Sequence, residues 1–172
     1  DEKIIITVSR LTHKNAVDII VRAMSFIKAG ARLLILGAGG EEARLRNLAR
    51  EMSLTDRIIF EKNIYEDLPA YLQLGHIFVR PSRSEGLGTA FLEAMAAGLP
   101  IVATSVGGIK DFLQDGETGL AVKVDAPEDL AKKIDLLFSD GALRQRLIEN
   151  GRKLVEEKYQ WAQIAAKIRD IF

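Results

Sequence analysis

The sequence predicts an α/β fold, a doubly wound parallel sheet of about six strands with helices on both faces. Short apolar runs, many of them β-branched, recur along the chain, and stretches with helical spacing of apolar residues lie between them. Because each run is apolar throughout, both faces of each strand should be buried, which is typical of parallel sheets. Right-handed crossovers then place a ligand at the carboxyl ends of the strands.

Apolar runs and glycine or proline breakers divide the chain into elements. We expect strands at residues 4–8, 32–36, 57–61, 76–80, 101–103 and 119–124. Asn15 should cap the first helix and Gly30 should end it. A later helix should begin at Thr89 and stop at Gly98. The remaining helices are expected at residues 41–52, 66–74, 109–114, 127–139, 142–158 and 162–171. The 172 residues are enough for one domain with a core.

Composition narrows the class of protein. Lys and Arg together number 24, as do Asp and Glu, and this zero net charge argues against a nucleic-acid partner. No apolar run has the length of a membrane span, and no signal peptide is recognisable, so a cytoplasmic location is expected. The absence of Cys excludes disulfides and thiolate sites, and two His residues are too few for a histidine-rich metal site.

The segment from Phe78 to Thr104, FVRPSRSEGLGTAFLEAMAAGLPIVAT, is the centre of the chain. It runs from a strand through a glycine-bearing loop into a helix and a second strand, an arrangement that aims backbone N–H groups at an anion. Glu85 lies in the loop, and Glu93 lies on the helix face of Thr89, four residues earlier. Both carboxylates are therefore expected to face one cavity.

Glu93 is unusual in the otherwise apolar helix segment FLEAMAAG. A buried carboxylate must be paired or hydrogen-bonded, so Glu93 could also be a satisfied structural carboxylate or point at solvent. The other helix face, with Leu92, Met95 and Ala96, is expected to pack on the sheet.

Two further loops follow predicted strands. The segment 37–40, Gly-Ala-Gly-Gly, fits neither the dinucleotide fingerprint nor a P-loop, so a tight turn with close backbone approach is favoured over phosphate binding. Arg10 and Lys14 follow the first strand and would face the same crevice as the central helix. A diphosphate needs cations together with N–H donors, although such residues are more often solvated loop charges.

The stretch PSRSEGLGTAFLEAMAAGLPIVATSVGG resembles the signature of the retaining family 4 glycosyltransferases of GT-B fold. Glu85 and Glu93 match the paired glutamates of that family. Its loop and breaker positions are matched by Gly86, Gly88, Gly98 and Pro100. Leu87 and Thr89 stand where the family usually has Phe and then Leu or Ile.

The resemblance implies roles for the loops. In the family, two cations after the first strand contact the donor's phosphates, which implies this role for Arg10 and Lys14. Two departures occur there, because Ser9 and Asn15 replace glycines that are common in the family. The family's second loop borders the nucleotide, which points to Gly37.

The resemblance also implies a set of donor contacts. Backbone groups near Ile64 would meet the base, although Lys62-Asn63 departs from the family pattern and the base is left open. The N–H groups of the loop from Gly86 through Leu87 and Gly88 to Thr89 would hold the diphosphate, and Glu93 would bind the ribose hydroxyls. Glu85 would orient the sugar ring, so the residues expected in catalysis are Glu85, Arg10 and Lys14.

The resemblance covers the whole chain but only the second half of a GT-B enzyme. It implies a donor-binding C-terminal domain that takes a UDP-, GDP- or ADP-sugar without cofactor or metal. The acceptor, a sugar or lipid-linked sugar, would be held by an N-terminal domain outside this sequence, which could also give peripheral membrane contact. The isolated domain should then be inactive in transfer.

Two alternatives stay open at this point. An epimerase or phosphorylase of GT-B fold would handle phosphate similarly. A non-catalytic nucleotide-sugar sensor is the other alternative, although it would not need both glutamates.

Overall fold

The computed structural model of the chain describes residues 2–62 and 67–159, and these residues form an α/β fold with one six-stranded parallel sheet. The strands are β1 (Ile4–Val8), β2 (Arg32–Leu36), β3 (Ile58–Glu61), β4 (Ile77–Arg80), β5 (Ile101–Thr104) and β6 (Leu120–Val122). Their order in the sheet is β3-β2-β1-β4-β5-β6, with every neighbouring pair parallel. From β1 the chain first adds strands on one side, β2 and then β3. It then crosses back to the other side of β1 and adds β4, β5 and β6, which confirms the doubly wound topology predicted from sequence.

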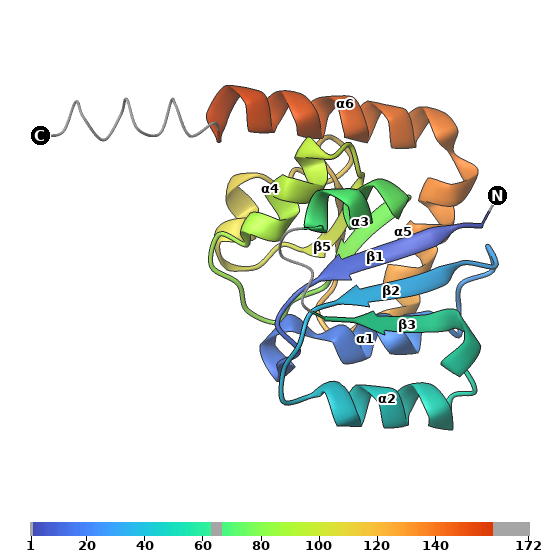
Figure 1. The fold of residues 1–172 in the computed structure, drawn as a ribbon. Helices are drawn as coiled ribbons and strands as arrows, with labels where there is room; N and C mark the ends of the chain where they lie inside the picture. The colour runs from blue at the N-terminus through green and yellow to red at the C-terminus, as the bar shows by residue number, and fades with distance from the viewer. Residues whose placement is uncertain (1, 63–66, 160–172) are drawn as a thin grey trace, which may run out of the picture.

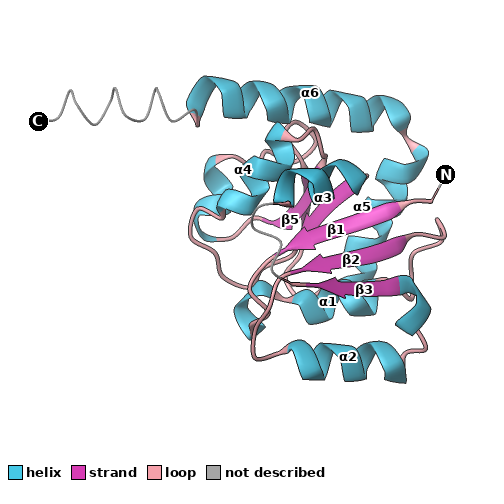
Figure 2. Ribbon diagram, viewed as in Figure 1, coloured by secondary structure: helices cyan, strands magenta, loops and turns pink. Residues whose placement is uncertain are grey.

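Helices cover both faces of this sheet (Figures 1 and 2). They are α1 (Val17–Ala23), α2 (Glu42–Glu51), α3 (Leu68–Leu74), α4 (Thr89–Ala96), α5 (Pro127–Ser139) and α6 (Gly141–Lys158). Short 3₁₀ turns lie at His13–Asn15, Thr55–Arg57 and Gly107–Asp111. In Figure 1, α1 and α2 lie below the sheet, while α3, α4 and α6 lie above it.

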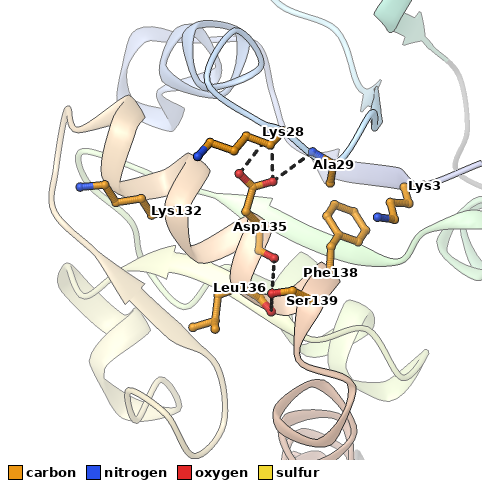
Figure 3. A pocket seen from close by; sticks show the side chains of 8 residues that line it. All are labelled: Lys3, Lys28, Ala29, Lys132, Asp135, Leu136, Phe138 and Ser139. Atoms are coloured by element: carbon orange, nitrogen blue, oxygen red, sulfur yellow. Dashed lines mark hydrogen bonds between the residues drawn. The ribbon is translucent and has the colours of Figure 1, made fainter.

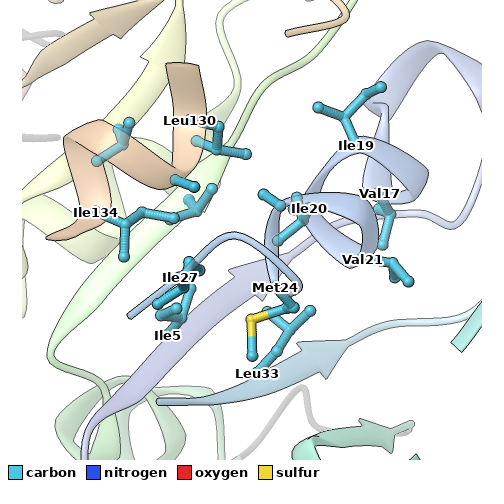
Figure 4. Close-up of a cluster of buried hydrophobic side chains, with 14 of the residues drawn as sticks. Ile5, Val17, Ile19, Ile20, Val21, Met24, Ile27, Leu33, Leu130 and Ile134 are labelled. Atoms are coloured by element: carbon cyan, nitrogen blue, oxygen red, sulfur yellow. The ribbon is translucent and has the colours of Figure 1, made fainter. Parts of the chain in front are cut away.

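Two apolar clusters hold the helices to the sheet. On one face, Ile5 and Leu33 of the sheet pack with Ile20 of α1 and Leu130 of α5 (Figure 4). On the other face, the Phe78 ring meets the edge of Phe91 of α4 with centroids 5.4 Å apart. Adjacent strand residues supply opposite faces, so the continuous apolar runs are explained by burial on both sides.

The first helix differs from its prediction. It ends at Ala23 rather than at Gly30, and Asn15 does not cap it. Ala16 occupies the cap position in a left-handed conformation, with φ 53°, and the Asn15 side chain is buried and bonded elsewhere. The competing use of the amide therefore outweighed the capping preference that Asn has at such positions.

Smaller differences concern element ends and one helix face. The helix expected at residues 109–114 is the 3₁₀ turn Gly107–Asp111, and the sixth strand is shorter than expected. In α4 the buried side chains include Phe91 and Met95, whereas Ala96 is exposed and Leu92 is half-buried. Compared with the expected orientation, α4 turns a different face toward the sheet, because Phe91 fills the core next to Phe78. Residues 162–171, expected to be helical, lie outside the described residues.

Candidate functional site

A cleft of about 590 Å³ lies at the carboxyl ends of β1, β2 and β4. It is lined by Val8, Ser9, Arg10, Lys14, Asn15, Leu36, Gly37, Ala38, Leu68, Arg80, Glu85, Gly88, Thr89, Ala90 and Glu93. Its volume is within the range of small-molecule sites, about 300–1,000 Å³. Parallel strands bring all of these loops to one edge of the sheet, where ligands of open α/β sheets bind.

One wall of the cleft is a pair of loops that run side by side. The loop after β1 and the loop after β2 are joined by hydrogen bonds from Leu11 N to Ala38 O, 2.9 Å, and from Glu41 N to Leu11 O, 3.1 Å. Gly37 has φ 141°, and a Cβ there would lie 2.0 Å from the carbonyl oxygen of Ser9. This close approach requires glycine and agrees with the tight turn favoured from sequence.

Arg10 and Lys14 project from the first of these loops. Both are exposed, and neither side chain forms an ion pair or hydrogen bond within residues 2–62 and 67–159. The backbone of this loop is nevertheless held, because Arg83 N donates to Lys14 O over 2.8 Å. Two cations without partners thus lie on a fixed backbone at the cleft.

Glu85 enters the cleft from the loop between β4 and α4. Its side chain is only 8% exposed and forms an ion pair with Arg80. Ser82 Oγ donates to Glu85 Oε2 over 3.5 Å, and Gly86 N donates to Glu85 Oε1 over 3.1 Å. Both carboxylate oxygens therefore have protein partners, which fixes the orientation of the group.

The opposite wall is the start of α4. Gly88 caps this helix in the left-handed region, with φ 68°, and Thr89 is its first residue. The first N–H groups of a helix have no intrahelical acceptor and attract negative charge. Glu93 lies one turn further on, exposed, with no hydrogen bond or ion pair to the described part of the chain. Glu93 is therefore not a satisfied structural carboxylate, and it lines the cleft as an exposed side chain.

Beneath the cleft, Arg80 ends strand β4 as a buried cation, 8% exposed. Its guanidinium contacts Glu85, Asn15 Oδ1 at 3.3 Å and Val8 O at 3.4 Å, and lies 5.5 Å from the centre of the Phe91 ring. Burial lowers the pKa of Arg80 below its ordinary value, and the charge of Glu85 opposes this shift.

At the rim, Arg83 joins three segments. Its guanidinium makes two hydrogen bonds of 3.0 Å to the Asp18 carboxylate of α1, and Nε lies 2.7 Å from Asp125 Oδ1. It also donates to His13 O over 2.7 Å. Burial acts to raise the pKa of Asp18, but the hydrogen bonds and charge of Arg83 outweigh it and hold that pKa below its ordinary value. The same hydrogen bonds raise the pKa of Arg83.

The family described as Glycosyl transferases group 1 matches residues 1–154 of this sequence. The chain belongs to this family. The GDP-mannose-dependent alpha-(1-6)-phosphatidylinositol monomannoside mannosyltransferase of Mycobacterium tuberculosis is 33% identical to it over 177 residues, which cover 96% of this chain and 46% of that protein.

Solved structures share the fold of this glycosyl transferases group 1 chain. Sucrose-phosphate synthase from Thermosynechococcus elongatus superposes with a TM-score of 0.94 at 32% identity, covering 99% of this chain and 45% of that one. Anabaena HepE in complex with UDP and glucose also gives 0.94, at 20% identity, covering 99% and 48%. The chain spans about half the length of the relatives that it matches.

The cleft of this glycosyltransferase-family chain brings together most of the residues singled out from sequence. Those that line it are Arg10, Lys14, Gly37, Glu85, Gly88, Thr89 and Glu93. Gly86 and Leu87 are exposed on the loop above and are not part of the lining, and the Gly86 N–H is occupied by Glu85. Ile64 lies outside the described residues.

Sequence reasoning missed Arg80 and Asn15, although a signal for Arg80 was available. Phe78 packs on the α4 side of the sheet and Val79 on the other, so alternation returns Arg80 to the α4 side. A cation at the buried end of an apolar strand needs an acidic partner, and Glu85 is the first acidic residue after it in the chain. For Asn15 the sequence offered only the departure from the family's glycine.

A second cavity, of about 390 Å³, lies near the amino end of β1, between residues 28–29 and α5 (Figure 3). Its central carboxylate, Asp135, accepts hydrogen bonds of 3.2 Å from the backbone N–H groups of Lys28 and Ala29. Lys3 lies over the Phe138 ring, 5.1 Å from its centre. The Asp135 carboxylate thus joins α5 to residues 28–29, whereas the side chains of Lys28 and Lys132 are exposed and have no partner among the described residues.

The residues that the structure describes contain no cluster of three or more His, Asp or Glu side chains that could hold a metal ion. None of their helices has the length and apolar character to cross a membrane.

Proposed function

We propose that the chain is the donor-binding C-terminal domain of a retaining glycosyltransferase of GT-B fold, family 4, and that its cleft holds a nucleotide-diphosphate sugar. The observation that carries this proposal is that one cleft contains a helix N-terminus, two carboxylates and two cations that have no partner among the residues described. The family membership gives the reaction class, and the relatives named as glycosyltransferases favour it over an epimerase or phosphorylase.

The diphosphate lies between Arg10, Lys14 and the first turn of α4. Three cationic and two acidic side chains line the cleft, so it carries net positive charge toward an anionic ligand. In the reaction, negative charge grows on the departing nucleoside diphosphate. Fixed cations and helix N–H groups stabilise that charge without having to reorganise.

The two carboxylates take different parts of the donor. Glu93 is exposed and without a protein partner among the described residues, so it is free to accept hydrogen bonds from the ribose hydroxyls. Glu85 is oriented by Arg80 and Ser82 and faces the sugar ring near the anomeric carbon. Glu93 can thus adapt to the ribose, whereas Glu85 is preorganised. Preorganisation matters most at the reacting end of the substrate, where orientation determines the rate.

The donor is a UDP-, GDP- or ADP-sugar, bound without metal or cofactor. The mycobacterial relative is named for GDP-mannose and the HepE structure for UDP and glucose, so relatives of this fold take different bases. Backbone groups near Ile64 are the proposed contact with the base.

The acceptor, a sugar or lipid-linked sugar, binds to an N-terminal domain outside this sequence. The chain corresponds to less than half of each relative reported above, which supports a cleft completed by a second domain. The isolated chain should bind donor and transfer nothing, because half of the cleft is absent.

Titration calorimetry tests this proposal with UDP, GDP, ADP and the three corresponding nucleosides. At least one nucleoside diphosphate should bind, and its nucleoside should bind more weakly because the cations contact only the phosphates. Equal affinity for nucleoside and diphosphate would contradict the placement of the diphosphate. Detectable sugar transfer by the isolated chain to an added acceptor would contradict the proposal that a second domain is needed to complete the cleft.

A further inference from the structure

Arg80 and Asn15 form a buried polar bridge beneath the cleft, between the loop that carries Arg10 and the loop that carries Glu85. Asn15 is 1% exposed, and its Nδ2 donates to Arg10 O over 2.6 Å. Its Oδ1 accepts from Arg80, which is ion-paired with Glu85. The chain of contacts therefore runs from the backbone of Arg10 to the carboxylate of Glu85.

Arg80 is the more consequential member of this bridge. A buried cation is costly unless it is paired, and here its one acidic partner among the described residues is Glu85. Its Nε is buried without a hydrogen-bond partner in the described chain. The guanidinium thus gives up one of its own hydrogen bonds while it holds Glu85. The contacts of the guanidinium are thus directed at Glu85, Asn15 and Val8 through its two terminal nitrogens.

Arg57, a partly buried arginine at the opposite end of the sheet, is an arginine whose hydrogen bonds are satisfied within the fold. Its Nε and Nη2 both donate to Ala31 O, over 3.2 and 3.0 Å, and its Nη1 donates to Met24 O over 3.1 Å. Arg57 bonds only to backbone carbonyls, at the amino side of β3, away from the cleft lining. It joins no carboxylate to any other group.

We propose that Arg80 is a positioning residue for sugar recognition, which holds the Glu85 carboxylate toward the donor's sugar and is itself held by Asn15. The proposal rests on the function proposed above, since Glu85 must face a sugar. Without the guanidinium, Glu85 would be a poorly exposed carboxylate lacking its counter-charge, and it would turn toward solvent. Asn15 replaces a glycine, so the bridge depends on a side chain that the family pattern does not supply.

The measurement is the sugar gain, defined as the affinity for a nucleotide sugar divided by the affinity for its nucleoside diphosphate. The probes are UDP and UDP-glucose, GDP and GDP-mannose, and ADP and ADP-glucose. We expect R80M to reduce the sugar gain about tenfold, the size of one charge-assisted hydrogen bond, while affinity for the nucleoside diphosphate changes little. R80K should lose part of the gain, because an ammonium cannot contact Glu85 and Asn15 as a planar fork does.

A double-mutant cycle separates positioning from general damage. E85Q should remove the sugar gain, and R80M added to E85Q should reduce it no further, because Arg80 acts through Glu85. N15A should cause a smaller loss, of about threefold, that vanishes in the R80M background. R57M is the matched control, expected to lower the thermal midpoint and leave the sugar gain unchanged.

The outcomes distinguish this inference from the proposed function. If E85Q removes the sugar gain and R80M and R80K retain it, Arg80 does not position Glu85 and the inference is wrong. Additive losses for R80M and E85Q would overturn it as well. If the unsubstituted chain binds no nucleoside diphosphate or has no sugar gain, the proposed function fails and this inference fails with it.

Discussion

The two ends of the sheet each carry a cavity lined by exposed cations, Lys28 and Lys132 at the amino end and Arg10 and Lys14 at the carboxyl end, but the acidic groups and the backbone around them are used differently. At the amino end, the carboxylate of Asp135 receives backbone N–H groups, and Arg57 donates to backbone carbonyls. At the carboxyl end, Arg10, Lys14 and Glu93 have no partner among the described residues. Both ends belong to the same sheet, so the fold alone does not produce the difference.

The carboxyl end differs in that its unpartnered cations share one cleft with the exposed carboxylate of Glu93 and the N-terminus of α4. Charges that are satisfied within the chain stabilise it and have little left for a ligand. Charges held on a fixed backbone without partners can bind a ligand without first breaking internal contacts, which lowers the cost of binding. Substitutions at the two ends should therefore affect different measurements.

The largest expected effect is on phosphate binding at the carboxyl end. Arg10→Ala should weaken a nucleoside diphosphate about tenfold to a hundredfold, since a charge-assisted hydrogen bond contributes about 1.5–3 kcal/mol. The affinity for the bare nucleoside should not change. Lys14→Ala should act in the same direction with a smaller loss, because a lysine offers a point charge rather than a planar fork. Titration calorimetry with UDP, GDP, ADP and their nucleosides gives both values.

Lys132→Ala is the control for this pair, because Lys132 is an exposed cation that lines the cavity at the amino end. It should leave both affinities unchanged. An equal loss for diphosphate and nucleoside in Arg10→Ala would show that Arg10 does not contact the phosphates.

The next effect concerns the ribose. Glu93→Ala should lower the affinity for a ribonucleoside and for its diphosphate by the same factor, about tenfold, because the lost hydrogen bonds are those to the ribose hydroxyls. Deoxyribose ligands such as dUDP should respond little to the substitution. A loss confined to the diphosphate would place Glu93 beside the phosphates instead and contradict its proposed role.

A smaller effect is expected on stability at the rim. Asp18→Asn replaces the carboxylate that receives both Arg83 nitrogens and should lower the free energy of unfolding by about 1–2 kcal/mol near neutral pH. The pKa of Asp18 is held below its ordinary value in the folded protein, chiefly by the hydrogen bonds and charge of Arg83, so the ionised carboxylate stabilises the fold at any pH above its unfolded-state pKa. The stabilisation is lost as the pH falls through the folded-state pKa.

Urea denaturation of both proteins at a series of pH values measures this difference. The stability gap between wild type and Asp18→Asn should be full above about pH 5 and narrow progressively as the pH falls below about 4. A gap that stays constant over this range would show that the ionised carboxylate is not the cause.

The sequence predicted the sheet well because continuous apolar runs and glycine breakers are local signals. All six strands and the parallel arrangement were confirmed, and the glycine loop before α4 led to Glu85 and Glu93 on one cleft. The predicted cap of the first helix was wrong, because Asn15 is bonded to Arg80, 65 residues away, and no local pattern contains that contact. The helix also ends earlier than expected, at Ala23. For Arg80 the local signal, an arginine at the end of an apolar strand five residues before Glu85, was overlooked, whereas its contacts with Val8 and Asn15 could not be predicted from local sequence.

The smallest effect is expected from Asp135→Asn, the counterpart at the amino end of the Asp18→Asn substitution. The amide oxygen of Asn can still accept one of the N–H groups of Lys28 and Ala29, and the existing bonds are 3.2 Å long and partly solvated. The free energy of unfolding should therefore fall by only about 0.5–1 kcal/mol, the net value of an ordinary hydrogen bond. Affinity for the nucleoside diphosphate should be unchanged, whereas Asp18→Asn, through Arg83 and the Lys14 backbone, should reduce it slightly. Urea denaturation and calorimetry on both variants make the comparison. If Asp135→Asn weakened the diphosphate as much as Asp18→Asn, the two ends of the sheet would not be functionally separate.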